Sequence, residues 1–169
     1  LSERYREELT NEIPEIDKIY GKFDWTNLTA DLAKKHPAIM PYDRVITTPK
    51  HYTYIKIAEG CNRFCAFCAI PLITGRFTSR KKEDILEEVK MLAQRGVKEF
   101  NIIAQDLSSY GLDIYGKMAL PELIDEMSNI NGVKWIRLHY AYPAQFPIEI
   151  LDVMARHSNV CNYLDIALQ

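Results

Sequence analysis

Between residues 51 and 169 the sequence alternates between segments typical of β-strands and segments typical of amphipathic helices. Residues 52–58 alternate β-branched and aromatic residues with polar ones, which predicts a strand. Further strands are predicted at 97–104, 133–140 and 162–167, and helices between the strands at 79–95, 121–127 and 147–155. Helical crossovers of about a dozen residues join parallel strands. The order β-α-β-α-β-α-β therefore predicts an α/β fold on a parallel sheet, either a barrel or an open doubly wound sheet.

Residues at the ends of the predicted helices support this alternation. Ser79 is a predicted N-cap, and Gly96 stands at the C′ position of the same helix. Pro121 and Pro147 are suited to the first turn of the next two helices.

Residues 1–50 follow a different pattern. Short helices are predicted at 3–9, 14–20 and 27–35, and prolines at 37, 41 and 49 predict a linker over residues 36–50.

Composition narrows the function classes. The net charge of −2 gives no overall attraction to nucleic acid or to a membrane surface, so neither is an expected partner. The most apolar stretch, near residues 64–73, is interrupted and too short to cross a bilayer. Residues 1–8 lack the apolar centre of a signal peptide, and four cysteines without such a signal predict a reducing, cytoplasmic location.

The strongest chemical signal is the spacing C-x3-C-x2-C at Cys61, Cys65 and Cys68. Thiolates at this spacing are suited to ligating zinc or an iron–sulfur cluster. A zinc site would need His51 or Cys161 as a further ligand, and structural zinc sites use paired C-x2-C motifs that have no second copy here. The spacing therefore favours a cluster, and a [4Fe–4S] cluster on three cysteines leaves one iron open to a ligand.

Polar side chains follow each predicted strand, at the carboxyl edge where active sites of parallel folds gather. The three-cysteine segment follows the first strand. The residues that follow the other three strands are Gln105 and Asp106, then His139, Tyr140 and Tyr142, and finally Asp165 and Gln169.

Aromatic and basic residues around the cysteines have two interpretations each. Phe67 lies between the second and third cysteine, where its ring could cover a cluster or pack against a purine. Residues 75–82 form a basic stretch that is either a solvated surface or an anion site built on Arg76 and Arg80.

Arg137 and His139 differ by two positions and so share one face of a strand. In an ordinary sheet His139 would be a core histidine, whereas in a barrel it would face a substrate-binding lumen. Gln105 has no proton to titrate, so it would position a ligand rather than transfer protons.

A three-cysteine loop with an aromatic residue before its last cysteine, after the first strand of a β/α array, resembles the radical S-adenosylmethionine (SAM) enzymes. The resemblance implies a partial parallel (β/α) barrel, with four of six strands present here. It also implies that Cys61, Cys65 and Cys68 hold a [4Fe–4S] cluster whose open iron binds SAM. One electron from the cluster then cleaves SAM to a 5′-deoxyadenosyl radical that abstracts hydrogen from a C–H bond.

Residues 51–63 and 68–80 resemble, more closely, the methylthiotransferases of that superfamily. The tRNA-modifying branch typically has Gln-Asn after the second strand and Ser-His-Pro near the third. This chain has Gln105-Asp106, the segment 138–143 (LHYAYP) and the segment 163–165 (YLD), which resemble the RimO-type branch that modifies a ribosomal protein.

That resemblance implies addition of a methylthio group to the β-carbon of an aspartate in small-subunit ribosomal protein twelve, with an electron donor such as flavodoxin. Alternatives are a tRNA methylthiotransferase and a non-catalytic, metal-stabilised binding module. The residues expected near SAM or substrate are Phe67, Arg76, Arg80, Gln105, Arg137 and His139.

The resemblance also predicts the domain organisation. Residues 1–36 correspond to the C-terminal remnant of an N-terminal domain, 37–50 to a linker, and 51–169 to an incomplete radical SAM core. In the family the N-terminal domain holds an auxiliary [4Fe–4S] cluster on three further cysteines. We therefore expect that cluster to be absent from this chain, and the chain alone not to complete methylthiolation.

Overall fold

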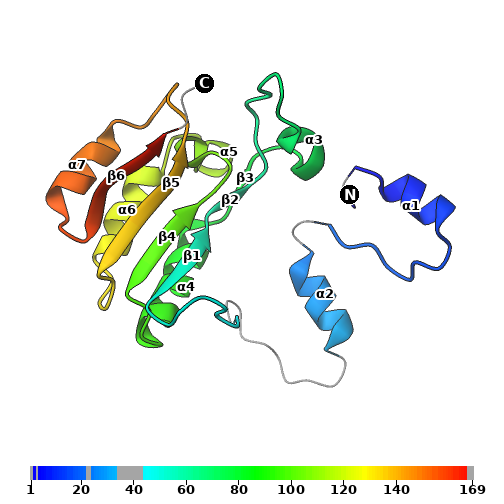
Figure 1. The fold of residues 1–169 in the computed structure, drawn as a ribbon, viewed down its shortest axis with the longest axis horizontal. Helices are drawn as coiled ribbons and strands as arrows, with labels where there is room; N and C mark the ends of the chain where they lie inside the picture. Colours follow the sequence, from blue (N-terminus) through cyan, green and yellow to red (C-terminus); the bar gives the residue numbers. More distant parts are fainter. Residues whose placement is uncertain (1, 3, 22–23, 34–43, 167–169) are drawn as a thin grey trace. The chain divides into compact units, whose positions relative to one another are not determined.

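The computed structural model describes residues 2, 4–21, 24–33 and 44–166 (Figure 1). In these residues the chain divides into two compact units. The sheet unit comprises Arg44–Gly60 and Phe77–Gln169, and the loop unit comprises Leu1–Asp43 and Cys61–Arg76.

The sheet unit is built on parallel strands in the order β1-β4-β5-β6. Their bounds are β1 (Tyr52–Lys56), β4 (Glu99–Ile103), β5 (Trp135–Ala141) and β6 (Val160–Ile166). Each predicted strand is present within a few residues of its predicted range, and the predicted parallel α/β class is confirmed.

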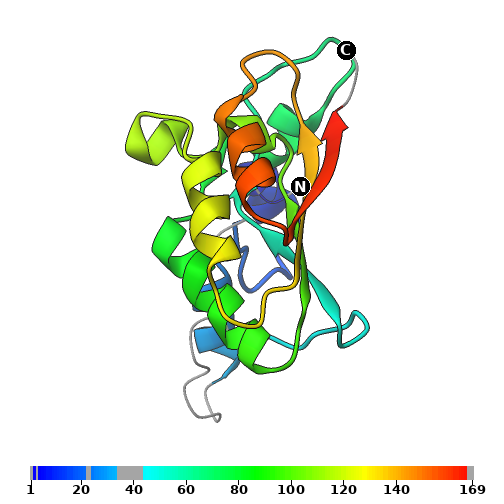
Figure 2. The ribbon, with the colours of Figure 1, turned by 90° about the vertical axis from the view of Figure 1, so that its left-hand side faces the viewer.

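Helices α4 (Lys82–Gln94), α6 (Leu120–Ser128) and α7 (Glu149–Arg156) cover one face of this sheet (Figure 2). Side chains along each strand point alternately to the two faces of the sheet, and the helices bury those on one face. One row crosses all four strands as Ile55, Ile102, Leu138 and the partly buried Leu164, and a second, buried row crosses as Thr53, Phe100, Ile136 and Val160. These rows and the apolar faces of the helices form the hydrophobic core.

The alternate residues of the same strands lie on the opposite face, which no helix of the sheet unit covers in its described part (Figure 2). In register across the strands, this open face carries Tyr54, Asn101 and Arg137, and one step further along Lys56, Ile103 and His139. Apart from Ile103 its residues are polar, charged or aromatic, whereas the residues of the covered face are apolar apart from Thr53.

Shorter elements connect the strands at their carboxyl edge. They are β2 (Ala58–Glu59), β3 (Thr78–Ser79), η1 (Leu107–Ser109) and α5 (Leu112–Tyr115). β2 and β3 pair antiparallel, with Ala58 opposite Ser79 and Glu59 opposite Thr78.

The two predicted ends of α4 have different outcomes. Gly96 has φ +99°, and Val97 N–H donates to Leu92 O, so the predicted C′ glycine is confirmed. The predicted N-cap at Ser79 is wrong, because Ser79 belongs to β3 and its hydroxyl donates to Asp113. The helix instead begins at Lys82.

The loop unit contains α1 (Arg6–Glu12), α2 (Trp25–Leu32) and α3 (Ile70–Thr74). The helix predicted at 14–20 is wrong: a turn closes between Ile16 N–H and Ile13 O, and the residues that follow it up to 20 are not helical. Residues 14–18 are exposed, so a seven-residue helix there would lack the packing that short helices need. Lys18 and Tyr20 instead bind Asp31 of α2, each at 2.7 Å.

The first part of the predicted linker, up to residue 43, lies outside the described residues, as does Gln169. Among the described residues, no helix combines the length and the apolarity needed to span a bilayer.

Candidate functional site

The three-cysteine loop, Cys61–Arg76, leaves the sheet unit after β2 and returns at β3. Its two ends are joined by a hydrogen bond from Cys61 N–H to Gly75 O at 3.3 Å. Gly60 and Phe64 both adopt positive φ, at +79° and +49°. A non-glycine residue at positive φ stores strain that is common where a loop is shaped for function.

The cysteines themselves differ in environment. Cys61 is buried, Cys65 is partly buried and Cys68 is exposed, and none of the four cysteines forms a disulfide. Arg63 N–H points to Cys61 Sγ at 3.4 Å, and Cys68 N–H donates to Cys65 O at 3.0 Å in a turn. Among the described residues, no three Cys, His, Asp or Glu side chains are close enough together to hold a metal ion.

The donor set of this loop suits a soft metal centre. Three thiols within eight residues match the thiolate preference of zinc and iron–sulfur clusters, and a backbone N–H aimed at a sulfur is the kind of contact that tunes a cluster's potential. The loop therefore has the right ligands, and binding would have to draw the three sulfurs together.

The other predicted residues of the loop unit are open to solvent. Phe67 is fully exposed. Arg76 is also exposed. The ring of Phe67 is therefore accessible to a planar ligand.

In the sheet unit, Gln105 follows β4 and is anchored by its amide nitrogen, which donates to Glu59 Oε1 at 3.0 Å. Lys56 forms an ion pair with the same glutamate. Gln105 Oε1 is buried and has no hydrogen-bond partner among the described residues. A buried acceptor without a donor is costly, so this oxygen is suited to a donor group on a ligand.

Asp106, expected at the rim beside Gln105, turns inward instead. It is 2% exposed and caps η1, accepting from Ser108 N–H at 2.9 Å and from Ser109 Oγ at 2.7 Å. Ser108 Oγ in turn binds the backbone of Tyr142, which ties the end of β5 to the end of β4. Asp106 is therefore a structural cap.

His139 is held on the open face of the sheet. Its Nε2 lies 3.0 Å from Asn101 Oδ1, and its Nδ1 lies 3.9 Å from Asp165 Oδ2. An amide oxygen only accepts, so Nε2 carries the hydrogen and, in neutral His139, Nδ1 carries a lone pair. The next residue, Tyr140, has φ +71°, a strained position near the end of β5.

The two predicted arginines of the sheet unit are both paired with glutamates. Arg137 Nε donates to Glu99 Oε1 at 2.6 Å, and this bond raises the pKa of the guanidinium further above its ordinary value. Arg80 Nη2 lies 2.8 Å from Glu88 Oε2, and its Nη1 donates to Lys56 O.

Sequence reasoning missed Glu59, Glu88, Glu99 and Asn101. Of these, Asn101 had a usable signal, because it is the one polar residue in the strand sequence FNII and lies two positions from Glu99 on the same face.

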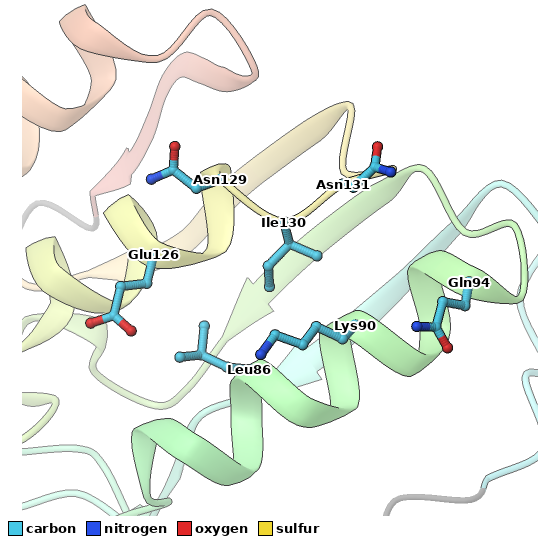
Figure 3. Close-up of a pocket in the computed structure, with 7 residues that line it drawn as sticks. All are labelled: Leu86, Lys90, Gln94, Glu126, Asn129, Ile130 and Asn131. Atoms are coloured by element: carbon cyan, nitrogen blue, oxygen red, sulfur yellow. The ribbon is translucent and has the colours of Figure 1, made fainter.

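A groove of about 510 Å³ lies elsewhere, between α4 and α6 on the helical side (Figure 3). Leu86 and Ile130 contribute its apolar part, and Lys90 and Glu126 line it from the two helices. Because α4 ends just before β4 begins, this groove lies toward the amino ends of the strands, away from Gln105 and His139.

Comparison with known proteins identifies the family. The model of the radical SAM superfamily matches residues 55–169, which include the three cysteines, the end of β1 and the whole of β4 and β5, together with β6. The chain belongs to the radical SAM superfamily. The predicted superfamily resemblance is thereby confirmed.

Curated relatives are similar over the whole chain. The chain is 59% identical over 169 residues to the ribosomal protein uS12 methylthiotransferase RimO of Phocaeicola vulgatus, and 59% and 58% identical to those of Bacteroides fragilis and Porphyromonas gingivalis. In each case the match covers 100% of this chain and 39% of the relative. These relatives confirm the resemblance to the RimO-type branch.

A solved radical SAM structure shares the fold. The methyltransferase TsrM from Kitasatospora setae, with tryptophan substrate and the SAM analogue aza-SAM bound, matches 68% of this chain and 24% of its own, with a TM-score of 0.50 and 20% identity. At that identity the likeness concerns the fold alone.

Proposed function

We propose that the chain is the radical SAM core of a methylthiotransferase that adds a methylthio group to the β-carbon of an aspartate in ribosomal protein uS12. The observation that carries the proposal is the near-60% identity, without a gap in coverage, to relatives named uS12 methylthiotransferases. Identity at this level along the whole chain favours the ribosomal-protein branch over the tRNA-modifying branch.

Cys61, Cys65 and Cys68 would hold the cluster. When bound, a [4Fe–4S] cluster supplies the electron for reductive cleavage of SAM. The chain contributes three thiolates, a loop closed at its base by Cys61 and Gly75, and the Arg63 N–H that lies 3.4 Å from Cys61 Sγ. An N–H directed at a ligating sulfur stabilises its negative charge and so favours the reduced centre.

Gln105, Arg137 and His139 would bind SAM or substrate from the sheet unit. Gln105 Oε1 is the buried acceptor without a partner, which suits an ammonium or hydroxyl donor. Arg137 and His139 share the open face, where the cationic Arg137 suits a carboxylate and the Nδ1 lone pair of neutral His139 suits a donor group.

Phe67, Arg76 and Arg80 complete the proposed set. Phe67 offers an exposed ring for stacking on the adenine, and Arg76 an exposed cation for a carboxylate. Arg80 already binds Glu88 and the Lys56 carbonyl, so its contribution would come through the backbone it fixes.

The parent protein would supply what this chain does not contain. The chain spans about two-fifths of the length of the curated relatives, 39%. We propose that 1–36 belong to a preceding domain that carries the auxiliary sulfur-handling cluster, that 37–50 link it to the core at 51–169, and that the protein works in the cytoplasm with a flavodoxin-like electron donor.

The test is to assay the parent protein anaerobically, with SAM and a reductant, on recombinant uS12 and on tRNA in parallel. Mass spectrometry should find a methylthio group on one aspartate of uS12 and none on tRNA. Cys65→Ala should abolish the product, and Cys161→Ala, at the cysteine outside the loop, should retain it. Modified tRNA with unmodified uS12 would overturn the proposal.

A further inference from the structure

The three-cysteine loop is attached to the sheet unit through a very short ladder, which we call the neck: β2 and β3, two residues each. Arg80 N–H extends it by donating to Ile57 O at 2.8 Å. Two-residue strands have little stability of their own. The contacts that hold the neck in place therefore determine how rigidly the three-cysteine loop is attached to the sheet unit.

One carboxylate binds the neck at two points. Asp113, in α5, accepts from Ser79 N–H at 2.8 Å through Oδ2 and from Ser79 Oγ at 2.6 Å through Oδ1. Ser79 Oγ also accepts from Gly111 N–H at 3.0 Å, so its hydroxyl has both a fixed donor and a fixed acceptor. Ser79 is 8% exposed, and water could not easily replace these bonds.

The segment that carries Asp113 is itself rigidly placed. Gly111 has φ +90°, and a Cβ at this position would lie 2.6 Å from Ala119 Cβ, so close packing requires glycine here. Tyr110 Oη donates to Arg80 O at 3.0 Å, and Lys82 N–H donates to Tyr115 Oη at 2.8 Å. Four residues of the segment 110–115 thus bind the segment 79–82: Tyr110, Gly111, Asp113 and Tyr115.

We propose that Asp113 is a positioning residue for the three-cysteine loop: it fixes the neck through Ser79 and thereby fixes how Cys61 leaves the sheet unit. Its significance for catalysis rests on the proposed function. A carboxylate suits this arrangement best, because Ser79 presents two donors to one side chain. An amide at this position would offer one acceptor, and its N–H₂ group could bind Ser79 Oγ only if the hydroxyl turned its own hydrogen away.

The first test uses the metal-free chain. Amide hydrogen exchange and iodoacetamide alkylation of Cys61 are compared in the wild type, Asp113→Ala, Asp113→Asn and Ser79→Ala. Asp152→Ala, which removes an exposed carboxylate of α7, is the matched control. We expect at least tenfold faster exchange at Ser79 and Arg80 and several-fold faster alkylation of Cys61 in Asp113→Ala, a smaller change in Asp113→Asn, and none in Asp152→Ala.

Protection of the β4 amides reports whether the sheet unit stays folded. If Asp113→Ala loses the protection of the β4 amides, Ser79→Ala tests the same contact, because it removes only the hydroxyl group that binds Asp113. Wild-type exchange at the neck and wild-type alkylation of Cys61, with β4 still protected, would overturn the proposal.

A second test connects the neck to the cluster. The chain is reconstituted anaerobically with iron and sulfide, and SAM is titrated against the electron paramagnetic resonance signal of the reduced centre. Asp113→Ala should need about tenfold more SAM for half of the spectral change, and Asp113→Asn should lie between it and the wild type. An unchanged titration would overturn the role in catalysis. A wild-type chain that takes up no cluster would instead refute the proposed function, while the exchange experiment still decides the role of Asp113.

Discussion

Glu88 binds two arginines, and the loss of stability expected on its replacement can be worked out from these contacts. Its side chain lies on the buried face of α4 and is 6% exposed. Arg80 Nη2 lies 2.8 Å from one carboxylate oxygen and Arg44 Nε 3.2 Å from the other. Both arginines also donate to β1, to Lys56 O and to Tyr54 O, so the carboxylate joins a helix to an edge strand.

The loss of stability expected on replacing Glu88 depends on the balance between its attraction to the two arginines and the cost of desolvating the charges. At an effective dielectric of about 20, each contact near 3 Å contributes about 5 kcal/mol of attraction before desolvation. Breaking a buried pair by removing one partner costs about 3–5 kcal/mol. Arg80 and Arg44 are 28% and 38% exposed and can regain water, so the lower end applies. Glu88→Gln should therefore destabilise the sheet unit by about 3 kcal/mol.

Urea unfolding followed by far-ultraviolet circular dichroism measures this directly. With a slope of about 2 kcal/mol per molar urea, the midpoint should fall by about 1.5 M. Glu122→Gln is the matched control, because Glu122 forms an exposed pair with Lys117 and such pairs contribute less than about 1 kcal/mol. A midpoint shift for Glu88→Gln no larger than that of the control would refute the reasoning.

Further predictions concern single side chains. Asp106→Ala removes the cap of η1 and should cost about 1–2 kcal/mol in the same urea assay; an unchanged midpoint would count against the cap. Burial raises the pKa of Tyr110 above its ordinary value of 10.0, so the folded state keeps a proton that the unfolded state loses. The contribution of the protonated Tyr110 side chain to the stability of the fold is complete below about pH 10 and falls above that pH. Tyr110→Phe should lack that alkaline loss, and an identical loss in both proteins would argue against this assignment. Cys65→Ala should lower bound iron after reconstitution whereas Cys161→Ala should not; equal loss in both variants would contradict the ligand assignment.

Local signals in the sequence predicted the framework of the sheet unit. Aliphatic rows such as Ile55, Ile102 and Leu138 arise from alternation along single strands, and Gly96 ends a helix through its own backbone preference. The same logic correctly placed Gln105 and His139 at the carboxyl edge, because parallel strands share one orientation.

The errors and omissions come from contacts between distant residues. Ser79 has the sequence signature of an N-cap, but Asp113, 34 residues away, binds its hydroxyl. Asp106 is next to Gln105 in sequence yet turns inward to cap η1. The partnership of Asn101 with His139 depends on the register of β4 and β5, which no local pattern specifies. Sequence patterns therefore predicted the elements better than the partners of individual polar groups.

The central claim is that Cys61, Cys65 and Cys68 hold a cluster with one iron open to SAM. The most direct measurement is to reconstitute the chain anaerobically, count iron and sulfide, and record the electron paramagnetic resonance spectrum of the reduced protein with and without SAM. We predict about four irons and about four sulfides per chain, as in a [4Fe–4S] cluster, and a spectrum that changes when SAM is added. Colourless protein with a single zinc ion, or a cluster whose spectrum ignores SAM, would contradict the claim.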